Sequence, residues 1–136
     1  MSEFAQKDDI KRILKASQKI AVVGLSDKSY RPSYGVAQYL QSQSYSIFPV
    51  NPGHEKILGE PAYDSVLEIE DSIDLVNLFR RPKFVPQHVD EAIEIGAKYL
   101  WLQEGVIHPE SAQKARDAGL IVVMNRCMLK EHKKYM

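Results

Sequence analysis

The chain has 136 residues, a length that suits one domain with a single core and is too short for two ordinary domains. Lysine plus arginine and aspartate plus glutamate are equal at 18 each, so no overall field attracts nucleic acid or an acidic membrane surface. No apolar run approaches the ~20 residues of a membrane span, and the first residues lack a signal-peptide core. We therefore expect residues 1–136 to form one cytoplasmic domain that binds neither nucleic acid nor membranes.

The residue types that most often bind metals are sparse in this chain. The single cysteine, Cys127, excludes an internal disulfide and leaves no cysteine cluster for zinc. The histidines are scattered without metal-ligand spacing, so we predict no metal site. We interpret each of them as a surface or capping residue: His54, His88, His108 and His132.

The first two elements are a helix and a strand. Residues 8–17 carry apolar residues at helical spacing, with acids first and bases after, which predicts a helix. The next apolar run, Ile20–Val23, is short and rich in β-branched residues, as in a parallel strand buried on both faces. Gly24 marks the turn after this strand. Ser33 is predicted to cap a second helix, whose apolar positions run from Val36 to Leu40.

The loop between Gly24 and the second helix predicts an anion-binding site. The N-terminus of the helix presents free amides and a positive dipole end, and Lys28 and Arg31 add two cations. The dinucleotide fingerprint is absent, because it needs closely spaced glycines and the next glycine after Gly24 is Gly35. An ordinary connection without a ligand is the alternative interpretation of this stretch alone.

The rest of the chain alternates strands with helices. Strands are predicted at residues 45–50, 74–79, 99–103 and 120–124, and helices at residues 65–69, 86–96, 109–118 and after Cys127. Pro49 is unusual inside a central strand, so we expect the ladder to be interrupted close to it. The alternation predicts right-handed crossovers and hence an α/β, Rossmann-like, doubly wound sheet of about five mainly parallel strands, with helices on both faces.

In an open α/β sheet, ligands bind where the carboxyl ends of the strands meet. The segments that follow the predicted strands are residues 24–31, 51–53, 79–82, 103–105 and 125–127. They carry cations suited to phosphate: Lys28, Arg31, Arg80, Arg81 and Arg126. The second strand ends at Asn51, where an NAD site normally has an acid, and this favours a ligand with an extra phosphate over NAD.

The ordered set of segments resembles a known family. The segments are Val23-Gly-Leu-Ser26, Val50-Asn-Pro-Gly53, Gly59-Glu-Pro61, Leu78-Phe-Arg-Arg-Pro82, Glu91-Ala-Ile-Glu-Ile-Gly96, Gln103-Glu-Gly105 and Asn125-Arg-Cys127. Over roughly residues 18–130 they are similar to the CoA-binding domain of the succinyl-CoA synthetase α-subunit, and more closely to the small stand-alone CoA-binding proteins. The resemblance implies a Rossmann-like fold with coenzyme A (CoA) laid across the strand ends.

The resemblance also implies which residues contact CoA. The phosphates would be held by Gly24, Ser26, Lys28, Arg31, Ser33 and Gly35, the adenosine would lie by Asn51 and Pro52, and the nucleotide would be bordered by Phe79, Arg80, Arg81 and Pro82. The sequence departs from the synthetase after Gly53, where His54, Glu55 and Lys56 replace a lysine and glycines, so the basic contact there is either Lys56 or lost.

The chain ends where the synthetase begins the domain that carries its phosphorylated histidine. We therefore predict a non-catalytic carrier, sensor or binding module for CoA or an acyl-CoA, without catalytic residues and with an unknown protein partner. An acyl-CoA or nucleotide-dependent enzyme would have to use Cys127 or Glu104, since no Ser-His-Asp order and no paired catalytic carboxylates are present. An NAD-binding redox module would lack the second-strand acid.

Cys127 is either a small buried residue at the end of the sheet or a thiol that forms a mixed disulfide with CoA.

Overall fold

Short apolar segments form one parallel sheet in the computed structural model, which describes residues 7–136. The strands are β1 (Lys19–Val23), β2 (Ser46–Val50), β5 (Leu75–Leu78), β6 (Tyr99–Leu102) and β7 (Ile121–Met124). They lie in the order β2-β1-β5-β6-β7, and every neighbouring pair is parallel. The chain steps from β1 outward to β2 and then back past β1 to β5. The sheet therefore has its topological switch point between β1 and β5, where ligands of such folds bind.

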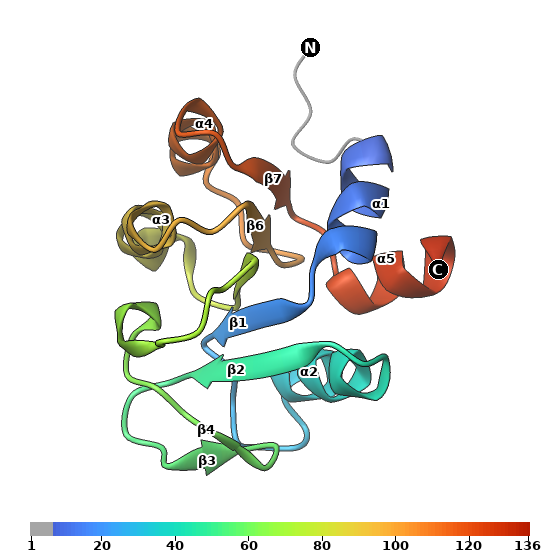
Figure 1. The fold of residues 1–136 in the computed structure, drawn as a ribbon, viewed down its shortest axis with the longest axis vertical. Coiled ribbons are helices and arrows are strands. Elements are labelled where there is room, and N and C mark those ends of the chain that lie inside the picture. The colour runs from blue at the N-terminus through green and yellow to red at the C-terminus, as the bar shows by residue number, and fades with distance from the viewer. Residues whose placement is uncertain (1–6) are drawn as a thin grey trace.

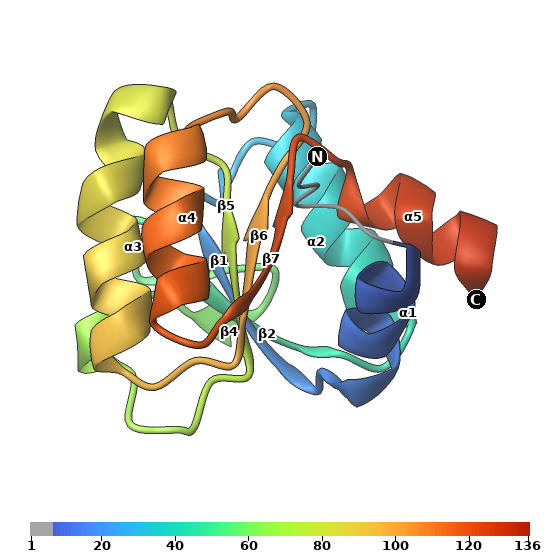
Figure 2. The same cartoon turned by 90° about the horizontal axis from the view of Figure 1, so that it is seen from above.

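Helices of the described chain cover both faces of the sheet (Figure 1). On one face lie α1 (Lys7–Ala16), α2 (Pro32–Ser42) and α5 (Met128–Tyr135), and on the other lie α3 (Val85–Glu94) and α4 (Pro109–Asp117). Figure 2 shows the sheet edge-on between these two groups. Two short 3₁₀ helices, η1 (Val66–Glu68) and η2 (Pro82–Phe84), precede α3. The predicted doubly wound α/β fold is confirmed.

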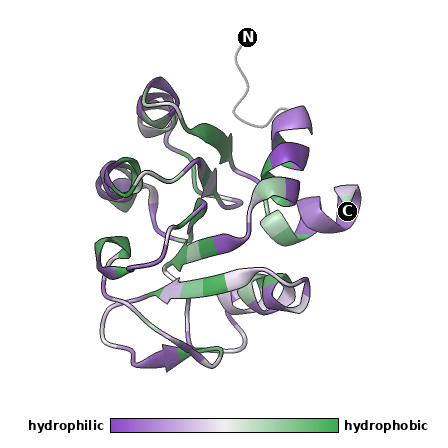
Figure 3. Ribbon diagram, viewed as in Figure 1, coloured by the Kyte–Doolittle hydropathy of each residue, from purple (hydrophilic) through white to green (hydrophobic). Residues whose placement is uncertain are grey.

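The strands are buried on both faces, because successive side chains point to opposite sides and helices cover the sheet on each side. In β1, Ala21 and Val23 belong to the apolar cluster under α3 and α4, whereas Ile20 and Val22 belong to the cluster under α1, α2 and α5. Figure 3 shows the strands largely green and the outer surfaces of the helices largely purple. A parallel sheet covered on both faces needs such continuous apolar runs. The pattern therefore predicts each strand of this sheet to within about one residue at either end.

Pro49 lies inside β2, opposite Val22 of β1, so the expected interruption of the ladder does not occur. β2 is an edge strand, where a proline is tolerated because its missing N–H can face away from the neighbouring strand. On the outer side, the carbonyl of Pro49 accepts a hydrogen bond from the N–H of Tyr63 at 3.0 Å. A small antiparallel hairpin, β3 (Lys56–Ile57) and β4 (Glu60–Pro61), follows β2.

Within residues 7–136, no helix is long and apolar enough to cross a membrane. The same residues contain no group of three histidine, cysteine, aspartate or glutamate side chains placed to hold a metal ion. The interpretation of His108 as a capping residue is confirmed, because its Nδ1 accepts a hydrogen bond from the N–H of Ser111 at the start of α4 (3.2 Å). For His88 and His132 the interpretation as surface or capping residues is wrong, because both are buried inside helices, at 6% and 7% exposed.

Candidate functional site

A cavity of about 920 Å³ opens at the carboxyl edge of the sheet. Its walls come from the segments that follow all the strands of the parallel sheet, namely parts of residues 24–36, 51–54, 79–82 and 103–106, together with Cys127. The residues predicted to bind CoA all line this cavity apart from Gly35 and Pro52, which are exposed and lie outside its lining. The fold thus brings together residues that are far apart in the sequence.

Gly24 allows the ends of β1 and β5 to approach each other closely at the cavity wall. Its φ is +85°, and a Cβ atom here would lie 2.2 Å from the carbonyl oxygen of Phe79 and 3.0 Å from Cδ of Arg80. Its N–H donates to the carbonyl of Val50 at 2.8 Å, which joins the end of β1 to β2. Because any side chain would collide with Phe79, the fold itself requires glycine at this position.

The loop from Ser26 to Arg31 is held against the start of α2 by its own hydrogen bonds. The N–H of Ser26 donates to Oγ of Ser33 at 3.0 Å, and the N–H of Lys28 donates to Oγ of Ser26 at 3.0 Å. The N–H of Arg31 donates to the carbonyl of Lys28 at 3.0 Å. These bonds give the loop a defined shape, with Lys28 and Arg31 exposed at the cavity.

The prediction that Ser33 caps α2 is wrong. The helix begins at Pro32, and the N-cap residue is Arg31, whose side chain makes no capping hydrogen bond. Proline suits the first helical position because its φ is fixed near the helical value and it has no N–H to satisfy. Ser33 therefore lies inside the first turn, 5% exposed, where its hydroxyl accepts from the loop instead. The proline itself was the sequence signal for the true start.

Four side-chain cations within the described residues line the cavity without an ion-pair partner: Lys28, Arg31, Arg80 and Arg81. Arg80 is half-buried, and its guanidinium carbon lies 4.2 Å from the ring centroid of Phe84. The guanidinium of Arg31 lies 5.8 Å from the ring centroid of Tyr30, a cavity residue that the sequence did not single out. Unpaired cations beside the N-terminus of α2 create a local positive potential, so the cavity favours an anion.

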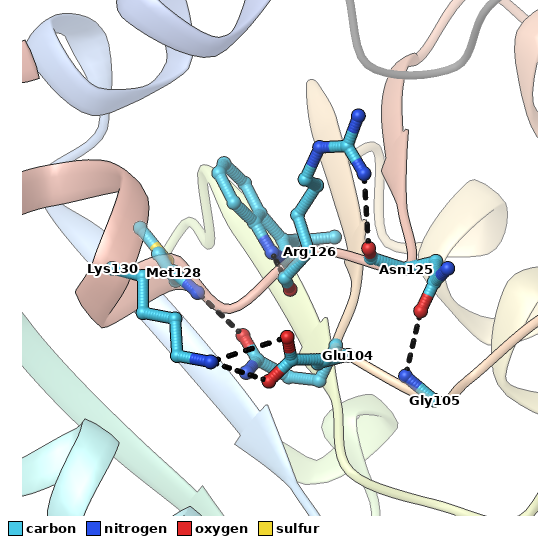
Figure 4. Close-up of polar contacts among 8 residues, drawn as sticks. Glu104, Gly105, Asn125, Arg126, Met128 and Lys130 are labelled. Atoms are coloured by element: carbon cyan, nitrogen blue, oxygen red, sulfur yellow. Dashed lines mark hydrogen bonds and ion pairs between the residues drawn. The ribbon is translucent and has the colours of Figure 1, made fainter. Parts of the chain in front are cut away.

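Arg126, the fifth cation predicted at this edge, does not line the cavity. Its side chain is exposed, and Nη1 donates to the carbonyl of Asn125 at 3.3 Å. Figure 4 shows this side chain extending away from Glu104 and Lys130. The backbone carbonyl of Arg126 accepts a hydrogen bond from Nε1 of Trp101 at 2.9 Å. Arg126 therefore shapes the loop after β7 through its backbone.

After β2, Asn51 and His54 reach the cavity wall. Nδ2 of Asn51 donates to the carbonyl of Leu25 at 2.8 Å, so its amide nitrogen holds the loop after β1 in place. Nδ1 of His54 lies 3.7 Å from a carboxylate oxygen of Asp27, another residue of the cavity. The turn residues of the sequence indicated where this loop lies. They gave no sign that His54 would reach across to Asp27.

The segments after β6 and β7 are joined by hydrogen bonds (Figure 4). The N–H of Gly105 donates to Oδ1 of Asn125 at 2.8 Å, and the N–H of Met128 donates to Oε1 of Gln103 at 3.1 Å. Asn125 has a φ of +62°, in the left-handed region that asparagine tolerates better than most residues. These bonds fix the wall that contains Cys127, which is half-buried between Arg126 and the start of α5.

Glu104 and Lys130 form an exposed ion pair at the same end of the cavity. Nζ of Lys130 lies 3.1 and 3.2 Å from the two carboxylate oxygens of Glu104, and Figure 4 shows the ammonium facing both. Glu104 raises the pKa of Lys130 above its ordinary value, chiefly through this hydrogen bond. Both oxygens of the carboxylate therefore face an ammonium in an exposed ion pair.

Comparison with known proteins agrees with this geometry. Residues 18–133 match the family described as a CoA binding domain. The uncharacterized protein YneT of Bacillus subtilis (strain 168) is 40% identical over 126 residues, which cover 93% of both chains. The ADP-forming acetate–CoA ligase I of Archaeoglobus fulgidus is 28% identical over 119 residues, which cover 80% of this chain and 17% of the ligase. The chain thus spans less than a fifth of that ligase.

A solved structure, described as a hypothetical protein from Pyrococcus horikoshii OT3, matches this chain with a TM-score of 0.92 and 44% sequence identity. The match covers 96% of this chain and 92% of that one, so the similarity extends over the whole fold of a small protein. The resemblance predicted from the ordered segments is confirmed by the family match and by these small relatives. The chain belongs to the CoA-binding domain family.

Proposed function

We propose that this chain binds CoA or an acyl-CoA in the cavity at the carboxyl edge of the sheet, as a non-catalytic carrier, sensor or binding module. The observation that carries the proposal is the set of four unpaired cations in the cavity, Lys28, Arg31, Arg80 and Arg81, beside the N-terminus of α2. CoA is an anion with a pyrophosphate and a ribose 3′-phosphate, so it needs several cations and amide donors around a nucleoside pocket. Membership of the family supports the same ligand.

The pyrophosphate is assigned to the loop after β1. Lys28 and Arg31 supply charge there. In the first turn of α2 the N–H groups of Tyr34 and Gly35 donate to the carbonyl of Arg31, which leaves the N–H of Ser33 to donate to an anion. The hydrogen bond from Ser26 to Ser33 holds the loop in one shape, so less conformational entropy is lost when an anion binds.

The nucleoside is assigned to the walls formed after β2 and β5. Asn51 lies by the adenosine, and Phe79 and Pro82 border the nucleotide, with Arg80 and Arg81 available for the 3′-phosphate. The nitrogen of the Asn51 side chain is already bonded to Leu25, and no acid follows β2 to hold ribose hydroxyls as an NAD site requires. This arrangement favours CoA over NAD.

The absence of catalysis is part of the proposal, and two observations support it, one on Glu104 and one on the ligase match. The Glu104 carboxylate faces Lys130 with both oxygens, so in this structure it serves as an ion-pair partner. The match to the acetate–CoA ligase covers 17% of that enzyme, so the activity of the larger protein does not follow from it.

Native mass spectrometry of freshly purified protein, followed by calorimetric titration with CoA and NAD, tests the proposal. We expect a retained species of CoA or acyl-CoA mass or an empty protein, and a titration in which CoA binds and NAD binds weakly or not at all. A retained nicotinamide dinucleotide, or an empty protein that CoA does not titrate, would overturn the proposal.

A further inference from the structure

The cavity changes character along the sheet. The cations line it after β1 and β5, whereas the part after β6 and β7 is lined by Gln103, Glu104, Gly105, Val106 and Cys127. No cation from these later segments lines the described cavity. A long ligand that is charged at one end and uncharged at the other fits this division.

Gln103 gives independent evidence that this end of the cavity receives a polar ligand group. This residue is 3% exposed and lines the cavity, and its Oε1 accepts from the N–H of Met128 at 3.1 Å. Its Nε2 has no hydrogen-bond partner among residues 7–136. This nitrogen is not fully buried, so it is accessible from the cavity and can donate to an acceptor on a ligand. The pantetheine arm of CoA carries two amide carbonyls of this kind.

Cys127 lines the same end of the cavity, and it carries the only thiol of the chain. It is half-buried, packs beside the apolar cluster under α1, α2 and α5, and occupies the N-cap position of α5. Its side chain makes no capping hydrogen bond, so the sulfur is not engaged by the helix. Cys127 therefore packs against the core and also faces the cavity, so its position is compatible with both a structural role and a reactive thiol.

The distance along the sheet matches the reach of the pantetheine arm. Neighbouring strands lie about 4.8 Å apart, so three spacings, from β1 past β5 and β6 to β7, span about 14 Å. The arm between the pyrophosphate and the sulfur of CoA has as many backbone bonds as four amino-acid residues, which extend about 14 Å. A pyrophosphate held after β1 thus allows the CoA sulfur to reach Cys127.

We propose that Cys127 forms a mixed disulfide with CoA, so that oxidation turns reversible binding into covalent storage; this inference rests on the proposed function. The Cys127 thiolate attacks one sulfur of CoA disulfide, a bond forms between Cys127 and that sulfur, and the disulfide bond breaks. The second CoA leaves as a thiolate and takes up the proton that Cys127 lost. Cys127 is oxidised, half of the CoA disulfide is reduced, and an added thiol reverses the exchange.

The test compares three samples by intact mass after incubation with CoA disulfide: the parent protein, Cys127→Ser, and the parent protein treated afterwards with dithiothreitol. We expect an adduct of one CoA on the parent protein, none on Cys127→Ser, and none after reduction. A parallel incubation uses pantethine, the disulfide of the same arm without its nucleotide and phosphates. We expect CoA disulfide to react at least about tenfold faster, because the cations hold it in place.

An unmodified parent protein, or equal rates with CoA disulfide and pantethine, would overturn the inference. Calorimetric titration of Cys127→Ser with reduced CoA separates this failure from failure of the proposed function. If reduced CoA binds this variant and the parent protein forms no adduct, only the covalent step is wrong. If reduced CoA binds neither the parent protein nor Cys127→Ser, the proposed function is wrong and the inference fails with it.

Discussion

The hydroxyl oxygen of Ser33 accepts a hydrogen bond from the backbone N–H of Ser26 at 3.0 Å, and this contact joins the first turn of α2 to the loop after β1. Ser33 is nearly buried, whereas the loop that it holds is exposed. The same Ser26 uses its own hydroxyl to accept from the N–H of Lys28. One serine inside a helix thus sets the shape of the segment to which we assign the pyrophosphate.

The first prediction concerns this contact. Ser33→Ala leaves the N–H of Ser26 without its partner, so we expect the free energy of unfolding to fall by about 0.5–1.5 kcal/mol and the affinity for CoA to fall as the loop loses its shape. Urea denaturation and calorimetric titration measure the two effects. Ser29→Ala is the matched control, because Ser29 is exposed in the same loop and does not line the cavity. Equal stability of Ser33→Ala and Ser29→Ala would contradict the role given to this bond.

The second prediction concerns Arg31. Its exposed side chain has no packing role in the core, so Arg31→Ala should leave the fold intact and weaken CoA binding by about tenfold to a hundredfold through loss of a charge-assisted contact. The control is Arg126→Ala, which removes the same charge from an exposed position outside the cavity lining. If the two variants bind CoA equally well, the phosphate site is not in the loop after β1.

The third prediction concerns the 3′-phosphate. If Arg81 contacts it, CoA should bind more tightly than dephospho-CoA by about tenfold or more, and Arg81→Ala should reduce that ratio while leaving dephospho-CoA binding nearly unchanged. Higher salt should reduce the ratio as well, since the contact is exposed. Lys83→Ala is the control, because Lys83 is an exposed cation nearby that does not line the cavity. An equal affinity of the parent protein for CoA and dephospho-CoA would mean that solvent surrounds this phosphate.

The sequence predicts the fold well because the information is local. A sheet covered on both faces needs continuous apolar strands, and each of these strands stands out as a short, mainly apolar run, Ile20–Val23 and Tyr99–Leu102 among them. Pro49 wrongly predicts a break in the ladder, because a proline destabilises a central strand but is tolerated in an edge strand. No residue near Pro49 indicates that β2 is an edge strand.

The site is predicted only in outline, because its contacts join distant segments. The sequence predicts the positions of the loops after the strands. Three features depend on three-dimensional packing and are not local: the hydrogen bond from Met128 to Gln103, the approach of His54 to Asp27, and the outward direction of the Arg126 side chain. Gly24 shows the same limit. Its position before a basic loop indicates a phosphate site. The structure adds that a Cβ at this position would collide with the carbonyl oxygen of Phe79, just after β5.

The fourth prediction uses two glycines of this region as a matched pair. Gly24→Ala should lower the free energy of unfolding by at least about 1–3 kcal/mol, since the new Cβ would meet the carbonyl of Phe79 and the residue has a positive φ. Gly35→Ala should raise it by about 0.5–1 kcal/mol, because Gly35 is exposed in α2 and a Cβ there would meet nothing within 4 Å. Chemical denaturation of both variants measures the difference. A Gly24→Ala protein as stable as the parent would show that the strand ends can separate easily.

The last prediction concerns His132, which fastens α5 to α2 on the face opposite α3 and α4. The residue is 7% exposed, its Nδ1 lies 2.8 Å from the hydroxyl of Tyr39, and the ring of Tyr45 packs against its ring edge-on. Burial lowers the pKa of His132 below the ordinary value of 6.5. The unfolded chain therefore binds a proton at a higher pH than the folded chain does.

The sign of the effect follows from this difference in pKa. Above about pH 6.5 the imidazole is neutral in both states, and the contribution of His132 to stability is complete. As the pH falls through 6.5 toward the lower pKa of the folded state, protonation favours the unfolded chain and the free energy of unfolding should decrease. Urea denaturation between about pH 7.5 and about pH 5 should show this decrease in the parent protein and a smaller one in His132→Gln. His54→Gln is the control, because His54 is more exposed and lies outside this contact. A pH dependence that is unchanged in His132→Gln would assign the decrease to other groups and contradict the role given to His132.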